Sequence, residues 1–170
     1  MLYFANNTDP KFLGKVKLMK LFYFLDFGHV KKYGAPVTYD TYVNMEHGPI
    51  PSFIKNLVDT ATDDVDQSIL ADTITCEWQQ LSEGKTICRI RPVREFTKED
   101  EKLFSKSELE VLKQVCVRFG DKNMKVIEDA SHKETPWKET AFLDEIPYTL
   151  ATRDADSQVT EEEVELLMKI

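Results

Sequence analysis

The chain has 170 residues, of which 42% are hydrophobic, and a formal net charge of −8. Its length and apolar content suit one well-packed domain, and its acidic balance argues against a general nucleic-acid binder, because neutralising phosphates requires clustered lysine and arginine. No apolar run reaches the roughly 18 residues that a membrane span requires, so we expect a cytoplasmic protein.

A long helix is predicted over residues 11–33. Its apolar residues recur at steps of three and four and form two neighbouring rows, so the helix should contact other elements on several sides. Asp9 and Pro10 are expected to cap its start, Gly34 to end it and Pro36 to prevent its continuation. We expect this helix to lie at the centre of the domain.

Two shorter helices are predicted around the run MEHGPIPS, Met45–Ser52. The first begins near Thr38 and stops at Gly48-Pro49, and the second covers about 53–60. The acidic stretch that follows, 60–68, should form a surface loop. The positions expected to face inward from the second helix are Phe53, Leu57 and Ala61.

The pattern changes to alternation over about 73–91, which predicts a β-hairpin with one buried face. Its apolar positions are all even-numbered: Ile74, Cys76, Trp78, Cys88 and Ile90. Because directly opposed residues share a face, paired numbers must sum to an even value, which excludes a two-residue loop. A loop of three residues, Ser82–Gly84, fits if Gly84 adopts a positive φ. This register places Cys76 and Cys88 within reach of each other, although a disulfide would conflict with a reducing compartment.

Helices are predicted again in the second half of the chain. Two capping boxes, each a hydroxyl residue followed three positions later by glutamate, mark helix starts: Ser105 with Glu108, and Thr160 with Glu163. Between them, one helix is expected over 122–132 and a short one that has Pro136 in its first turn.

The complete pattern predicts an α+β fold, a mostly α-helical single domain around a long central helix with one β-hairpin at about 73–91. Residues 1–150 should form the domain itself. Residues 151–170 read as an acidic linker and a helix, either packed on the same domain or loosely attached to it.

No motif in the sequence argues for catalysis, a cofactor or a metal. The three histidines, His29, His47 and His132, lack the spacing of metal ligands, and Cys116 lies on the apolar face of its helix as a structural thiol would. We therefore expect a protein that is not an enzyme. An unrecognised hydrolase built around Glu46, His47 and His132 is kept as an alternative.

Two runs, EHGPIP and SHKETPWKE, each combine a histidine, a glutamate and a proline. They are the predicted contact points for a protein partner, because tryptophan in a polar setting can anchor an interface. The competing interpretation is that the first run is only a bend and that Trp137 covers helix ends. The predicted partner-binding residues are Glu46, His47, Pro51, Lys133, Glu134 and Trp137.

Taken in order, KLMKLFYFLDFGHVKKYGAPV, EHGPIPSFI, a strand pair, FSKSELEVLKQVCVRFGD and SHKETPWKET resemble the Panacea domain, the SocA-like, phage-associated antitoxin family. The resemblance spans about Lys11 to Ala141. His47 departs from the family, which often has an aromatic residue there. The matching positions are Leu18, Lys20, Leu21, Tyr23, Gly34, Pro36, Gly48, Pro49, Ser107, Glu108, Leu109, His132, Pro136 and Trp137.

The resemblance implies a bacterial or prophage antitoxin that neutralises a cognate toxin, encoded next to it, by direct binding. One member of the family is also described as an adaptor that delivers its toxin to a protease. A DNA-binding autorepressor of a toxin–antitoxin operon is the alternative, and it depends on one basic cluster: Lys11, Lys15, Lys17 and Lys20.

Overall fold

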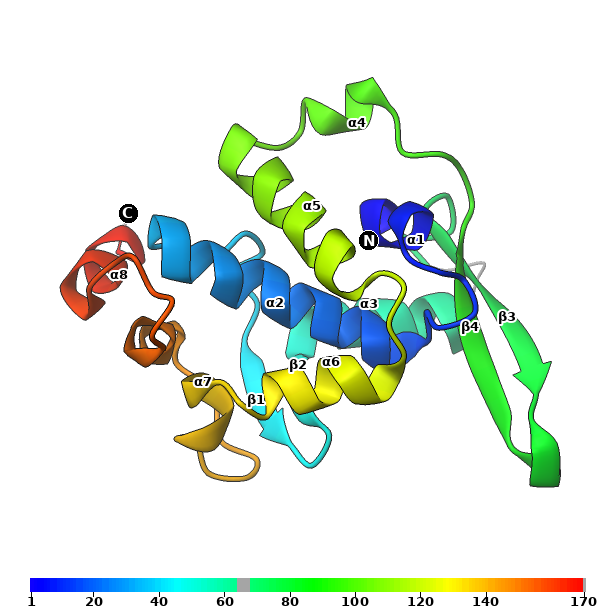
Figure 1. Ribbon diagram of the computed structural model, residues 1–170. Coiled ribbons are helices and arrows are strands. Elements are labelled where there is room, and N and C mark those ends of the chain that lie inside the picture. Colours follow the sequence, from blue (N-terminus) through cyan, green and yellow to red (C-terminus); the bar gives the residue numbers. More distant parts are fainter. Residues whose placement is uncertain (64–67, 170) are drawn as a thin grey trace.

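The computed structural model describes residues 1–63 and 68–169 (Figure 1). Within them, the fold is α+β, as predicted, with two antiparallel hairpins among helices. The strands are β1 (Tyr42–Met45), β2 (Gly48–Pro51), β3 (Ile74–Gln80) and β4 (Thr86–Pro92). The α-helices are α1 (Leu2–Asn7), α2 (Lys15–Tyr33), α3 (Ser52–Asp63), α4 (Lys98–Glu101), α5 (Lys106–Phe119), α6 (Met124–Ser131), α7 (Thr135–Lys138) and α8 (Glu161–Leu167). Two 3-10 helices are η2 (Ser82–Gly84) and η3 (Tyr148–Arg153).

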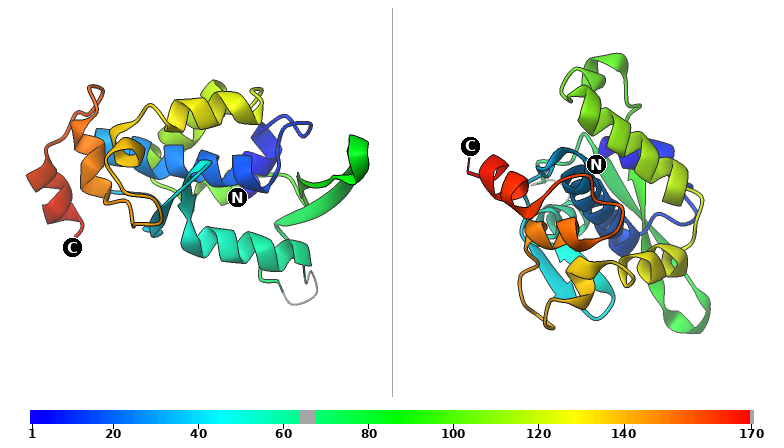
Figure 2. Two further views of the ribbon diagram at one scale, coloured as in Figure 1. Left: turned by 90° about the horizontal axis from the view of Figure 1, so that it is seen from below. Right: turned by 60° about the vertical axis from the view of Figure 1, so that its left-hand side comes forward.

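Helix α2 is buried along most of its length and packs against α5, α6, η3 and β2 (Figures 1 and 2). It ends as predicted at Gly34, whose φ is +83° and whose N–H bonds to the carbonyl of Val30. Its start is four residues later than predicted. The Asp9 carbonyl accepts the N–H groups of the next turn, and the Leu13 carbonyl accepts the N–H of Ile90 in β4 at 2.9 Å, so residues before Lys15 pair with a strand instead.

The helix predicted from Thr38 to Gly48 is wrong, because this segment forms β1 and turns into β2. Tyr42 is opposite Pro51, and Met45 is opposite Gly48. The other edge of β1 is bonded to the chain near residue 145, where Asn44 donates to the carbonyl of Asp144 at 2.9 Å. The pairing within the hairpin is local, but the partner of its outer edge lies about a hundred positions away in the sequence, where local spacing gives no signal.

Helix α3 follows β2 without a loop, and Asp40 holds its first turn. The Asp40 carboxylate accepts the backbone N–H groups of Phe53 at 2.8 Å and Ile54 at 2.7 Å. The residues that face the core are Ile54, Val58 and Ala61, so the prediction was right for Ala61 and wrong for Phe53, which is 64% exposed. The acidic loop predicted for 60–68 is wrong for residues 60–63, which belong to α3, and residues 64–67 lie outside the described residues.

The β3–β4 hairpin has the predicted register and loop. Gln80 is opposite Thr86, and Gly84 in the three-residue connection has a φ of +75°. Trp78 lies on the same face as Cys88 opposite it, but it is not buried, because this end of the hairpin extends beyond the core, and the residue is 57% exposed (Figure 1). Cys76 and Cys88 form a disulfide, with Cα atoms 5.4 Å apart.

Both predicted capping boxes are present, at the starts of α5 and α8, and Pro136 lies in the first turn of α7. The segment after η3 returns to α2, where Gln158 donates its N–H to the carbonyl of Lys31 at 2.7 Å. In α8, Val164 is buried. Among the described residues, no helix has both the length and the apolar character that crossing a bilayer demands.

Candidate partner-binding site

The turn between β1 and β2 requires a glycine for two reasons. Gly48 has a φ of +93°, which strains any residue with a Cβ. A Cβ at this position would also lie 2.7 Å from Nζ of Lys20 and 2.7 Å from Oγ of Ser131. The backbone of the turn therefore presses directly onto α2 and α6, which accounts for the Gly48-Pro49 pair on structural grounds alone.

Lys20 anchors this turn from beneath. Its side chain is fully buried, and Nζ donates to the carbonyl of Pro49 at 2.8 Å. Burial lowers the pKa of Lys20 to about 7, against the opposing effect of the Glu128 carboxylate, which raises it. Lys20 in α2 thus holds the β1–β2 hairpin in place through a buried hydrogen bond.

The two runs singled out in the sequence meet at this turn. The indole N–H of Trp137 donates to the carbonyl of Met45 at 3.3 Å, and the His132 ring stacks on Trp137 with centroids 4.0 Å apart. His47 faces Glu128, with Nδ1 and Oε1 separated by 3.1 Å. Burial lowers the pKa of His132, and the neighbouring Lys20 and His47 charges lower it further, while Glu128 and Asp129 oppose them.

Exposed apolar side chains lie next to the turn, on the loop that follows α7. Phe142 is 62% exposed and Leu143 is 59% exposed, although hydrogen bonds to Asn44 hold this segment in place. Leu143 donates its N–H to the carbonyl of Asn44 at 2.8 Å, and the Asn44 side chain donates to the carbonyl of Thr140. The turn and this loop lie side by side in Figure 1. We define the tip surface as Met45, Glu46, His47, Trp137, Phe142 and Leu143.

Only part of the predicted set belongs to this surface. Glu46 and His47 are exposed on the turn, and Trp137 is half-buried beside it. Pro51 is buried at the far end of the hairpin, opposite Tyr42. Lys133 is exposed, but it lines a groove with Asp154 and Asp156.

Glu134 cannot act as an exposed contact, because its carboxylate is buried in an ion-pair cluster. Its two oxygens lie 3.0 Å from Nζ of Lys31 and 2.9 Å from the hydroxyl of Tyr23. Lys31 also lies 2.9 Å from Asp154 and 3.2 Å from Asp156. Burial raises the pKa of Glu134, and Lys31 opposes this rise. The cluster ties α2, α7 and the C-terminal segment together.

Sequence reasoning missed Phe142, Leu143 and Met45. The pair of adjacent apolar residues in the polar run TAFLDE was a usable signal, because such a pair is either buried or part of a contact surface. Its position beside the turn could not be inferred, since it depends on hydrogen bonds to Asn44 that join residues far apart in the chain.

The alternatives that rested on histidines and lysines find less support. His29 bonds to the carbonyl of Ala35 and to Ser107, away from His47 and His132. Over residues 1–63 and 68–169, no three histidine, cysteine or acidic residues are grouped as metal ligands would be. In the basic cluster, Lys20 is buried, and so is Lys17, which donates to the carbonyls of Gly120 and Lys122.

Comparison with known proteins identifies the family. The model of the antitoxin SocA-like Panacea domain matches residues 18–138, which is well over half of the chain. The matched region contains α2 from Leu18 onward, both hairpins and the turn at Gly48-Pro49. Searches among curated proteins and among solved structures matched nothing. Membership of an antitoxin family implies a toxin partner in general terms and points to a non-enzymatic role. The chain belongs to the family of SocA-like antitoxins with a Panacea domain.

Proposed function

We propose that this protein is an antitoxin that neutralises a cognate toxin by direct binding through the tip surface. The toxin is encoded by a neighbouring gene, and neutralisation takes place in the cytoplasm, a compartment that the Cys76–Cys88 disulfide by itself argues against. The single observation that supports this proposal is the meeting of two family segments, Gly48-Pro49 and His132–Trp137, under a patch of exposed apolar and charged side chains.

The composition of the tip surface suits a protein partner. Phe142 and Leu143 offer exposed apolar area, and Trp137 and Met45 are partly accessible at the centre of the patch. Glu46 and His47 supply polar groups at the rim. Interfaces of this kind combine a desolvated apolar centre with a polar edge. Steric occlusion of the toxin is the simplest mode, and delivery of the toxin to a protease by the same contact is the second.

Autorepression by DNA binding is a weaker proposal. It required four clustered lysines, but Lys17 and Lys20 are committed to buried backbone carbonyls. Lys15 is paired with Asp59 at 3.1 Å. Little free positive charge remains for phosphates in this part of a chain whose net charge is −8.

The test is co-expression with the neighbouring gene, followed by measurement of growth and of complex formation. Phe142→Asp should abolish protection and weaken the complex at least about tenfold, because it replaces exposed apolar area of the patch by a charge. The matched control is Val117→Asp on α5, since Val117 is 84% exposed and lies outside the tip surface. Both variants should remain folded by circular dichroism.

Two results would contradict the proposal. A neighbouring gene product that is harmless when expressed alone removes the basis for an antitoxin. Equal protection by Phe142→Asp and Val117→Asp would place the contact somewhere other than the tip surface. We also propose that residues 1–150 form the antitoxin domain and that 151–170 pack on it, a proposal that the buried Lys31–Asp154 pair supports.

A further inference from the structure

The hydrogen bonds at the two ends of the β3–β4 hairpin show which residues of β3 face away from β4. The N–H of Val93 donates to the carbonyl of Thr73 at 3.1 Å, and the N–H of Leu81 donates to the carbonyl of Lys85 at 2.7 Å. In an antiparallel pair, residues that bond across the pair alternate with residues whose N–H and carbonyl groups point outward. The odd-numbered residues of β3 therefore bond to β4. The outward-facing residues are Ile74, Cys76, Trp78 and Gln80.

The outer edges of the other three strands are covered or blocked. The outer edge of β1 is bonded to the chain near residue 145, and the outer edge of β4 to the segment just before α2. In the β1–β2 hairpin, the N–H of Ser52 bonds to the carbonyl of Thr41, so the same alternation turns Pro49 and Pro51 outward. Proline has no N–H, and this edge of β2 therefore cannot accept another strand.

The outer edge of β3 has no such protection. Among the residues that the structure describes, the N–H and carbonyl groups of Cys76, Trp78 and Gln80 have no hydrogen-bond partner, while the N–H of Ile74 bonds to the carbonyl of Leu70. The strand contains no lysine, proline or glycine, the residues that usually keep an exposed edge from pairing. It is also the outermost strand of the hairpin in Figure 1. The open stretch is thus a template for another strand.

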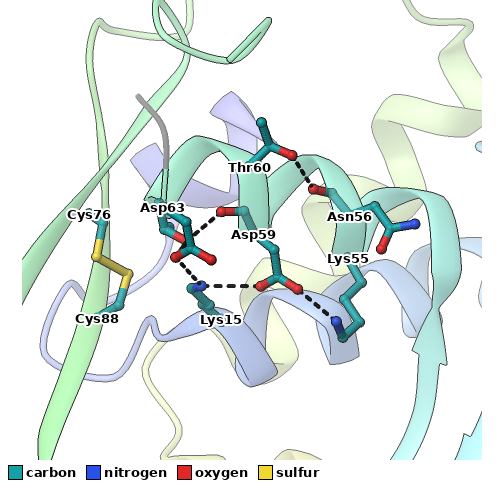
Figure 3. Close-up of polar contacts among 9 residues, drawn as sticks. Lys15, Lys55, Asn56, Asp59, Thr60, Asp63, Cys76 and Cys88 are labelled. Atoms are coloured by element: carbon teal, nitrogen blue, oxygen red, sulfur yellow. Dashed lines mark hydrogen bonds and ion pairs between the residues drawn. A yellow bond between two sulfur atoms is a disulfide. The ribbon is translucent and has the colours of Figure 1, made fainter. Parts of the chain in front are cut away.

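Covalent and ionic links hold this edge in a fixed shape. The disulfide between Cys76 and Cys88 joins β3 to β4 (Figure 3). On the opposite face of the hairpin, Nε of Arg91 donates to the Glu77 carboxylate at 2.6 Å. A strand that is already ordered loses little conformational freedom when it pairs, so less of the binding energy is spent on ordering it.

Symmetry selects a second copy of the chain as the occupant. With a two-fold axis at Trp78, Cys76 is opposite Gln80 of the second copy, and Trp78 is opposite its own counterpart. All the open positions then pair, and each pair exchanges two hydrogen bonds. An axis at Glu77 would place two carboxylates directly opposite each other, and an axis at Gln79 would leave Cys76 opposite the 3-10 helix η2.

The charges of the hairpin are compatible with this pairing. Residues 74–92 carry three basic and two acidic side chains, although the chain as a whole has a net charge of −8. Two copies therefore repel each other least where their hairpins meet. In the register centred on Trp78, Glu77 is opposite the neutral Gln79 of the second copy and keeps its own partner, Arg91.

Trp78 gives the pairing an apolar centre. The residue is 57% exposed, and on the two-fold axis its Cα would lie about 5.5 Å from that of its counterpart, so the two indoles would cover each other. Tryptophan at the centre of an interface commonly contributes a large share of the binding energy. Association thus provides a partner for a large aromatic side chain that the isolated chain leaves in water.

We propose that two copies of this chain associate through β3, so that their hairpins form one antiparallel sheet with Trp78 of both copies at the two-fold axis. Cys76, Trp78 and Gln80 do not belong to the tip surface. The inference therefore goes beyond the proposed function and does not depend on it.

The first test measures the oligomeric state of the full chain. Sedimentation velocity from about 1 to 100 µM should show a monomer–dimer equilibrium, since pairing of this length suits a dissociation constant in the micromolar range. Trp78→Lys and Gln80→Pro should each raise the dissociation constant at least about tenfold, because an edge lysine opposes pairing and the proline removes only an outward N–H. Trp78→Phe and Val117→Lys, on α5, should leave it nearly unchanged. Circular dichroism verifies that each variant is folded.

The second test needs no substitution. Amide hydrogen exchange, followed by NMR on the wild type, should show that the N–H groups of Cys76, Trp78 and Gln80 exchange more slowly in concentrated than in dilute protein. The odd-numbered amides of β3 bond to β4 in either state and serve as the internal control.

Three results would overturn the proposal. The first is a protein that stays monomeric at every concentration. The second is a dimer that persists in Trp78→Lys and Gln80→Pro, or whose outward amides exchange as fast as in the monomer, since the copies would then meet elsewhere. The third is protection of these amides only when the product of the neighbouring gene is added, which would assign the edge to a strand of that protein.

Discussion

Replacement of Gly48 by alanine should destabilise the protein strongly, although it adds only one methyl group. Gly48 has a φ of +93°, and an added Cβ would lie 2.7 Å from both Nζ of Lys20 and Oγ of Ser131. The substitution therefore imposes backbone strain and also displaces a buried ammonium group. Lys20 would lose its 2.8 Å hydrogen bond to the carbonyl of Pro49 if it moved away.

The two costs can be estimated separately. A residue with a side chain at such a φ costs about 1–3 kcal/mol. Below about pH 7, where Lys20 carries its charge, its hydrogen bond contributes about 1.5–3 kcal/mol, and its loss leaves a buried carbonyl without a donor. The free energy of unfolding should thus fall by about 3–5 kcal/mol, a large part of the roughly 5–15 kcal/mol of a typical domain.

Gly84 offers a matched control, because its φ is +75° and, among the described residues, no atom lies within 4 Å of the place that an added methyl group would take. Gly84→Ala incurs the backbone strain and changes the unfolded chain in the same way, but it displaces nothing. The difference between the two variants therefore isolates the displacement of Lys20, about 1.5–3 kcal/mol. Urea unfolding monitored by circular dichroism measures both, with an expected midpoint shift of about 2 M for Gly48→Ala at an ordinary m-value.

Equal losses in Gly48→Ala and Gly84→Ala, within about 0.5 kcal/mol, would refute this reasoning. They would mean that Lys20 and Ser131 accommodate the methyl group freely, and that the turn does not press onto α2 as the geometry indicates. Loss of neutralisation in Gly48→Ala without loss of stability would show that the turn contributes to toxin binding and not to the stability of the fold.

Three further predictions concern buried polar groups. Burial lowers the pKa of Lys20 from 10.5 to about 7, so between these values the unfolded state binds more protons than the folded state. The stability of the wild type relative to Lys20→Met, measured by urea unfolding, should therefore rise with pH from neutral to mildly alkaline buffer. A difference that does not change with pH would contradict this. Asp40→Ala should cost about 1–2 kcal/mol in thermal unfolding, because two N–H groups at the start of α3 lose their acceptor, and Asp40→Asn should cost less. Lys31→Met should cost about 3–5 kcal/mol in urea unfolding, because the largely buried Glu134 and Asp154 carboxylates would lose their cation. The double variant Lys31→Met with Glu134→Leu should recover part of this loss. A cost below about 0.5 kcal/mol would mean that the Lys31–Glu134 pair behaves as an exposed ion pair.

Features that depend on neighbours in sequence could be predicted. The capping boxes at Ser105 and Thr160 join groups three residues apart, and both are present. Parity excluded a two-residue loop, the positive φ open to Gly84 selected one of three residues, and the stop at Gly34 followed from the conformational freedom of glycine. Each depends on interactions that close within one turn of the chain.

The candidate site was predicted only in part. The two runs that meet at Gly48 and Trp137 were identified from their composition, and exposure of His47 on the turn agrees with the expectation of a surface position. The burial of Glu134 could not be predicted, because the sequence does not indicate that Lys31 lies beside it. A glutamate in a polar run is usually exposed, and only a distant cation makes its burial favourable.

The sequence by itself determined the α+β class, the helix limits set by caps and glycines, the β3–β4 register and the family. The tertiary structure alone decided that residues 42–51 are strands, that α2 begins at Lys15, and that Phe142 lies beside Met45. The start of α2 and the place of Phe142 depend on hydrogen bonds between segments tens of residues apart, and the local β1–β2 pairing is joined on its other edge by bonds to the segment near residue 145. The energy of such bonds exists only once the chain is folded.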